Sequence, residues 1–89
     1  MNELSSVSRP RVGAGFRLQW EPAQNCHVLL YPEGMVKLNH SAAEILRRCD
    51  GQRSVDEIVA ELEAQFSATG LGPQVSDLLL EGQRRGWIA

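Results

Sequence analysis

The stretch CHVLLYPEGMVKLNHS, which runs from Cys26 to Ser41, carries the signals that decide the fold of this chain. Apolar residues run through Cys26–Tyr31, a pattern typical of a buried strand. Pro32 suits the second position of a tight turn, and Gly34 suits its end. Met35–Leu38 then forms a short returning strand, so the stretch predicts an antiparallel hairpin.

The pattern changes to helical spacing at Asn39. Either Asn39 or Ser41 can cap a helix, and Ser41 with Glu44 matches a capping box. Asp50-Gly51 is a typical helix end. The first helix therefore has two alternative caps in the sequence.

Two more helices follow the first. Ser54 with Glu57 is a clearer capping box, Pro73 suits the first turn of a third helix, and Gly86 ends it. Behind each start lies an apolar stripe at helical spacing. The stripe of the second helix is Val55, Ile58, Val59, Leu62 and Phe66, and that of the third is Val75, Leu78, Leu79 and Gly82.

Strict alternation over Phe16–Trp20 predicts one more strand before the hairpin. The fold class is therefore α+β, with a three-stranded antiparallel sheet followed by three helices, like a winged helix whose sheet comes first. So small a sheet needs the helices on one of its faces and keeps open edges. The apolar pair Trp87-Ile88 closes the chain and must dock on this body.

Residues 1–14 are polar and lack periodicity, which predicts a flexible tail that is dispensable for folding. Residues 15–89 then form a single domain. If Gly34 has a positive φ in the predicted turn, valine at this position should destabilise the domain.

Length and charge exclude several classes of protein. The chain has 89 residues, enough for one domain, and a net charge of −2, which argues against a nucleic-acid partner. Its apolar runs are too short to span a membrane, and its first residues do not resemble a secretory signal. We therefore expect a cytoplasmic protein.

Residues with catalytic or metal-binding chemistry are few and scattered. Cys26, His27, His40 and Cys49 do not provide converging ligands, and adjacent strand residues point to opposite faces. The serines at the helix starts are better explained as caps, and no nucleophile elbow or phosphate loop is present. We expect no enzyme activity, no metal and no cofactor.

Two features instead favour binding. Met35–Leu38 is the last strand of the sheet, and an extended peptide can pair with its free edge. The alternative is an edge kept short to avoid aggregation. Leu80 lies opposite the apolar stripe of the third helix, where it is either an isolated surface leucine or a partner contact.

Several stretches together resemble the PqqD family over Phe16–Ile88. The most specific are a Tyr-Pro-Glu-Gly turn and a Lys-Leu-Asn that follows at this spacing. The matching stretches are Phe16–Glu21, Leu30–Met35, Lys37–Asn39, Ile45-Leu46, Asp50-Gly51, Val55, Ile58 and Trp87-Ile88.

The resemblance implies a RiPP recognition element, a domain that binds the leader of a ribosomally made peptide. The ligand would be the precursor peptide PqqA of pyrroloquinoline quinone biosynthesis. The partner would be the radical SAM enzyme PqqE, which cross-links a Glu and a Tyr in it. The family's groove lies between the third strand and the third helix. Carried over, the peptide-binding residues are Met35, Val36, Lys37, Leu38, Val75, Leu78, Leu79, Gly82 and Arg85.

The winged-helix-like order also allows an alternative, a nucleic-acid-binding domain. Its recognition helix would carry Asp77 and Glu81 against Arg84 and Arg85, whereas helices that read the major groove present several basic and polar residues. The sequence leaves the oligomeric state open, since strand edges and Leu80 also permit a homodimer.

Overall fold

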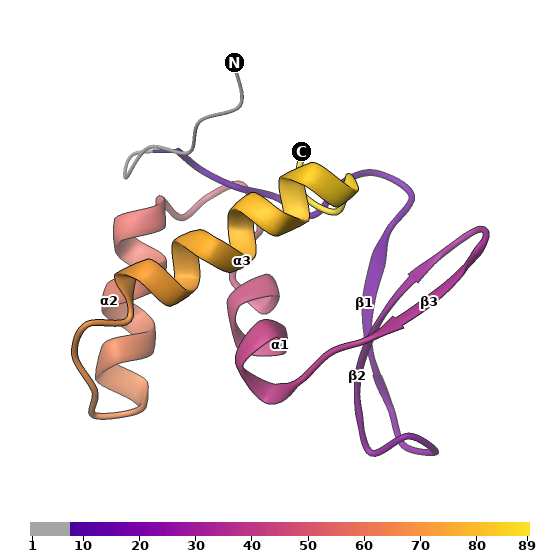
Figure 1. The fold of residues 1–89 in the computed structure, drawn as a ribbon, viewed down its shortest axis with the longest axis horizontal. Helices are drawn as coiled ribbons and strands as arrows, with labels where there is room; N and C mark the ends of the chain where they lie inside the picture. Colours follow the sequence, from indigo (N-terminus) through magenta and orange to yellow (C-terminus); the bar gives the residue numbers. More distant parts are fainter. Residues whose placement is uncertain (1–7) are drawn as a thin grey trace.

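The computed structural model describes residues 8–89 and shows three strands followed by three helices (Figure 1). This confirms the predicted α+β class and element order. The elements are β1 (Arg17–Glu21), β2 (Cys26–Tyr31), β3 (Gly34–Lys37), α1 (His40–Arg47), α2 (Val55–Gln65) and α3 (Gly72–Arg85).

The sheet is antiparallel throughout, with the order β1-β2-β3. β2 is therefore central, and β3 is an edge strand. The turn between β2 and β3 falls at Pro32 and Glu33, as predicted, but Gly34 does not have a positive φ. The expectation that valine at position 34 would meet backbone strain is therefore wrong.

Side-chain caps set the starts of the first two helices. The side chain of Asn39 accepts a hydrogen bond from the backbone N–H of Ala42 (2.8 Å), so Asn39, rather than Ser41, caps α1. Ser54 and Glu57 form the predicted capping box at the start of α2. Both caps satisfy backbone donors that lack a partner within the helix.

The prediction of a flexible tail is wrong for residues 8–14. Val12 pairs with Ile88, and Arg11 pairs with Asp50. The N–H of Gly13 also donates to the carbonyl oxygen of Trp87 (2.7 Å). These backbone bonds link the segment to the loop that follows α1 and to the C-terminus. Residues 1–7 of the predicted tail lie outside the described residues.

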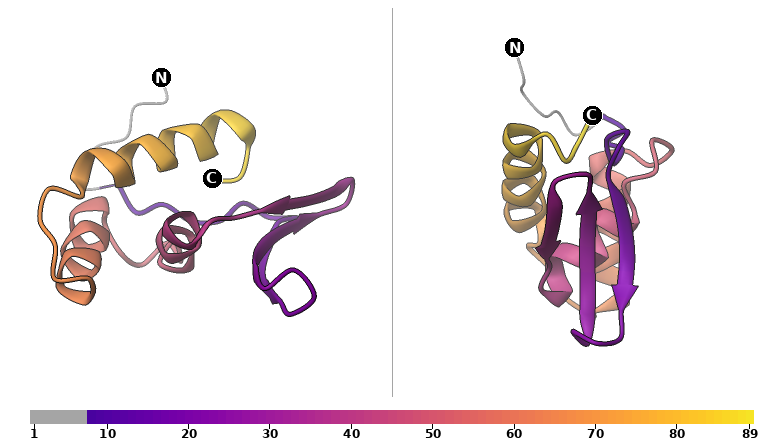
Figure 2. Two further views of the ribbon diagram at one scale, coloured as in Figure 1. Left: turned by 60° about the horizontal axis from the view of Figure 1, so that its bottom comes forward. Right: turned by 90° about the vertical axis from the view of Figure 1, so that its right-hand side faces the viewer.

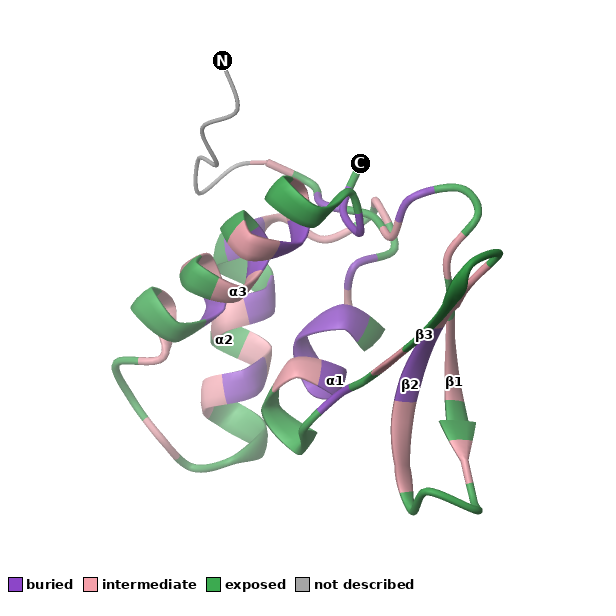
Figure 3. Cartoon of the chain, turned by 45° about the vertical axis from the view of Figure 1, so that its right-hand side comes forward, coloured by how far each residue is buried: buried purple, intermediate pink, exposed green. Residues whose placement is uncertain are grey.

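The core lies between the sheet and the three helices (Figure 3). Leu29 supplies the sheet's central side chain, and α1, α2 and α3 contribute Leu46, Ile58 and Leu79, all almost fully buried. Burial of such side chains is the main stabilising contribution. Trp87 and Ile88 dock on this core, as predicted.

The helices cover one face of the sheet, and α1 lies between the sheet and the other two helices (Figure 2). Consequently β3 and α3 do not pack directly on each other. Within residues 8–89 no helix has both the length and the apolar composition needed to cross a bilayer.

Candidate functional site

The outer edge of β3 carries unpaired backbone groups. On its inner edge, the N–H of Leu38 donates to the carbonyl oxygen of His27 (3.0 Å), and Val36 lies opposite Leu29. Because hydrogen-bonded positions alternate along an antiparallel pair, Val36 also turns its N–H and C=O toward β2. Met35 and Lys37 therefore direct their N–H and C=O groups away from the sheet, where another extended chain can pair with them.

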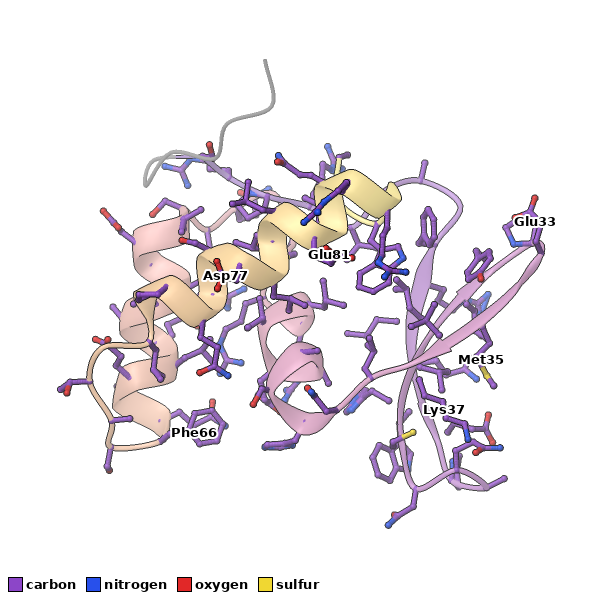
Figure 4. The ribbon with its side chains drawn as sticks, in the orientation of Figure 1. Glu33, Met35, Lys37, Phe66, Asp77 and Glu81 are labelled. Carbon is purple, nitrogen blue, oxygen red and sulfur yellow. The ribbon has the colours of Figure 1, made fainter. Side chains whose placement is uncertain are left out.

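The side chains of β3 divide between the two faces of the sheet. Val36 packs against the core and Leu38 is buried, with 6% of its surface exposed. Met35 and Lys37 are exposed and point away from the helices (Figure 4). Met35 and Lys37 therefore present both backbone groups and exposed side chains to a ligand. The side chains of Val36 and Leu38 instead hold the strand against the core.

The predicted residues of α3 lie at different depths. Leu78 is half-buried and Arg85 is exposed, whereas Leu79 and Gly82 lie in the core and leave no surface for a ligand. The prediction that Leu79 and Gly82 contact a peptide is therefore corrected. Val75 is also buried, although its side chain reaches the floor of a cavity between the helices.

A hollow of about 300 Å³, which we call the α1–α3 hollow, begins just beyond the end of β3. It lies between the start of α1 and the exposed flank of α3, and its lining is mainly apolar. Its lining residues are Asn39, Ser41, Ala42, Ile45, Gln74, Asp77 and Leu78. Of the predicted site residues, only Leu78 lines it.

Sequence reasoning missed Gln74 and Asp77 as lining residues. Together with Leu78 they follow i, i+3, i+4 spacing, so they share one flank of α3. That spacing is visible in the sequence. The flank that turns toward α1 depends on how α3 packs, which the helix's own pattern does not specify.

Charges on α3 differ in how they are balanced. Glu81 forms ion pairs with Arg84 (2.7 Å) and Arg85, and the hydrogen bond from Arg85 holds the pKa of the Glu81 carboxyl below its usual value. Arg85 also lies over the ring of Trp87, 5.6 Å from its centroid. Asp77, one turn earlier (Figure 4), has no hydrogen bond or ion pair within residues 8–89.

Neither histidine belongs to a metal-binding constellation. His27 contacts the ring of Trp20 edge-on, and His40 contacts Phe66 in the same manner. Across residues 8–89, no three His, Cys, Asp or Glu side chains come together in a way that could hold a metal ion. The arrangement offers backbone pairing at β3 and an apolar hollow beside it.

Comparison with known proteins places the chain among characterised relatives. The family model described as coenzyme PQQ synthesis protein D (PqqD) matches residues 26–88. The PqqA binding protein of Azotobacter vinelandii is 53% identical, with 99% of this chain and 97% of the relative covered. The PqqA binding protein of Pseudomonas aeruginosa is 51% identical over the same shares of the two chains.

A solved structure shares the fold. It is the solution NMR structure of the PqqD truncation of Methylobacterium extorquens PqqCD, described as a functional and stand-alone recognition element for ribosomally synthesised and post-translationally modified peptides. Its TM-score to this chain is 0.74 at 28% identity, and the alignment covers 98% of this chain and 95% of the other.

Proposed function

The chain belongs to the PqqD family, and we propose that it is a non-catalytic adaptor that captures a PqqA-type precursor peptide in pyrroloquinoline quinone biosynthesis. The observation that carries this proposal is the free edge of β3. Met35 and Lys37 offer outward N–H and C=O groups beside an apolar hollow. Backbone pairing of this kind can hold a flexible peptide whatever its side chains are.

The adaptor would present the bound peptide to the radical SAM enzyme PqqE. We place this step in the cytoplasm, where a ribosomally made peptide first becomes available. The free PqqA peptide is expected to be flexible, so its ordering offsets part of the binding free energy. An adaptor that holds it extended would remove that cost from the enzyme's own binding step.

The experiment is a calorimetric titration with the synthetic PqqA peptide of Azotobacter vinelandii. Lys37→Pro removes one outward N–H, whereas Lys37→Ala removes the same side chain and keeps the amide. We expect the proline variant to bind about 3–10 times more weakly than the alanine variant. Equal affinities would contradict strand addition at β3, and no binding by the parent protein would contradict the adaptor function.

A nucleic-acid-binding role gains no support from the surface of α3. Its two terminal arginines are already paired with Glu81, and Asp77 adds a further negative charge on the same helix. The charged residues of α3 therefore sum to zero, and the helix offers no excess positive charge to neutralise phosphates. A gel-shift at low salt without a retarded band would agree with this assignment.

A further inference from the structure

A second apolar space, which we call the three-helix cavity, lies among α1, the end of α2 and the start of α3. Its volume is about 220 Å³. Its floor is formed by core residues, and its rim carries His40 and the exposed ring of Phe66. The lining residues are His40, Ser41, Glu44, Ile45, Leu62, Phe66, Ala68, Leu71, Gln74 and Val75.

The size of the cavity fits one large side chain. An apolar cavity of about 150 Å³ is enough to hold benzene, so this one can take an aromatic ring or a branched aliphatic group. Phe66 is 42% exposed at the rim, and its ring meets that of His40 edge-on with 5.8 Å between centroids. A large exposed aromatic beside an apolar cavity is typical of a binding site.

The three-helix cavity adjoins the α1–α3 hollow. The two spaces share Ser41, Ile45 and Gln74 as lining residues. The hollow in turn begins at Asn39, just after β3 ends at Lys37. A peptide that pairs with β3 and extends past this end would run along the hollow toward the cavity.

The negative charge of the hollow favours a basic side chain in the bound peptide. Asp77 is the one acidic residue among the lining residues of the hollow, and it is exposed and unpaired within the described part of the chain. The next acidic residue on α3, Glu81, is balanced by two arginines. A basic side chain in the bound peptide would balance Asp77 and would fix the register of the peptide.

We propose that the three-helix cavity is a second subsite of the peptide, which takes a bulky apolar side chain while a nearby Lys or Arg of the peptide faces Asp77. This inference rests on the proposed function and adds to it a stated ligand chemistry. Pairing with β3 is indifferent to side chains, so this subsite would supply the sequence specificity that pairing lacks.

The first test fills the cavity. Ala68→Phe places a ring at its rim, and Ala64→Phe places the same ring on the exposed side of α2, outside the cavity. We expect the Ala68 variant to bind the Azotobacter vinelandii PqqA peptide at least about tenfold more weakly, with no change for the Ala64 variant. An alanine scan of the peptide's apolar residues should find one residue that contributes to the cavity contact. Its replacement should weaken binding of the peptide to the parent protein but not to the Ala68→Phe variant.

A second measurement does not depend on whether the Ala68→Phe variant folds. During peptide titration, the methyl NMR signals of Leu62 and Leu71 in the parent protein should shift, because both residues line the cavity and not the hollow. The signal of Ile58 should stay unmoved, because Ile58 is buried but does not line the cavity. Asp77→Asn should weaken binding by about two- to fivefold and reduce its salt dependence.

The outcomes separate the two proposals. Binding that is sensitive to Lys37→Pro while Leu62 and Leu71 stay unmoved would overturn the subsite and leave the adaptor function standing. Absence of any binding to the parent protein would overturn both. A peptide whose apolar residues can all become alanine without loss of affinity would also overturn the subsite.

Discussion

Gly82 of α3 lies directly against Ile88 at the end of the chain. A Cβ atom at Gly82 would stand 2.7 Å from Cγ1 of Ile88, closer than such atoms approach in proteins. The missing side chain therefore lets the C-terminus fold back onto α3, where the N–H of Trp87 donates to the carbonyl oxygen of Gly82 (2.7 Å).

Gly82→Ala should destabilise the protein even though alanine is the better helix former. The helix would gain about 1 kcal/mol, but overpacking typically costs about 1–3 kcal/mol. We expect a net loss of up to about 2 kcal/mol in chemical denaturation. Gly72→Ala is the control on the same helix, because a Cβ at that position meets nothing within 4 Å apart from its chain neighbours. Equal stabilities of the two variants would contradict the close contact.

Protonation of Glu44 should make the protein less stable in acid. Burial raises the pKa of its carboxyl, but hydrogen bonds and charge from Arg48 and Arg47 outweigh it, so the pKa lies below its usual value. The unfolded chain then binds this proton more tightly than the folded one. The stabilisation is complete above the unfolded pKa and is lost as pH falls through the folded pKa.

Glu44→Gln is the test of this contribution. The amide cannot ionise, so the free energy of unfolding should fall by about 1–3 kcal/mol at neutral pH. This gap in unfolding free energy between the variant and the parent protein should narrow in acid. Denaturation curves of both proteins between neutral pH and pH 3 measure the gap. A gap independent of pH would show that the Glu44 charge does not contribute.

The two cysteines should differ in reactivity. Burial, with a smaller effect of the Asp50 charge, raises the pKa of the Cys49 thiol to about 12, and its Sγ donates to the carbonyl oxygen of Ile45 (3.3 Å). Cys26 is only partly buried. Iodoacetamide at pH 8 should therefore label Cys26 alone, and Cys49 only after unfolding. Mass spectrometry of the digested protein reads this out, and early labelling of Cys49 would contradict it.

Removal of residues 8–14 should destabilise the protein. The segment makes backbone hydrogen bonds to Cys49, Gly51, Val55, Trp87 and Ala89, and Pro10 is buried. At about 0.5–1.5 kcal/mol for each bond, a chain that starts at Gly15 should lose on the order of 3–5 kcal/mol. A chain that starts at Ser8 is the control, since it keeps these bonds. Equal melting temperatures of the chains that start at Gly15 and at Ser8 would show that residues 8–14 are dispensable for folding.

Local sequence signals predicted most of the fold. The turn at Pro32, the capping box of Ser54 and Glu57, and the helix end at Gly86 depend on residues close together in the chain. Apolar spacing likewise identified most of the buried residues of the helices, but Phe66, the last residue of the stripe predicted for the second helix, is 42% exposed. The free edge of β3 was predicted as well, because the last strand of a meander has only one neighbour.

Other features depended on contacts between distant residues. The pairing of residues 8–14 uses backbone groups, which every residue has, so no pattern of side chains predicts it. Ser41 and Glu44 have capping-box spacing, yet Glu44 is held by Arg47 and Arg48, and Asn39 caps the helix instead.

The candidate site shows the same division between sequence and tertiary structure. The sequence by itself determined the elements, their order, and the edge strand on which a peptide can pair, because these follow from local periodicity and turn chemistry. Only the tertiary structure decided that α1 separates β3 from α3, that Leu79 and Gly82 are buried, and that Gln74 and Asp77 face the hollow. The reason is physical: a helix's own pattern defines its buried face, but the neighbour that covers each flank is chosen by packing among all the elements.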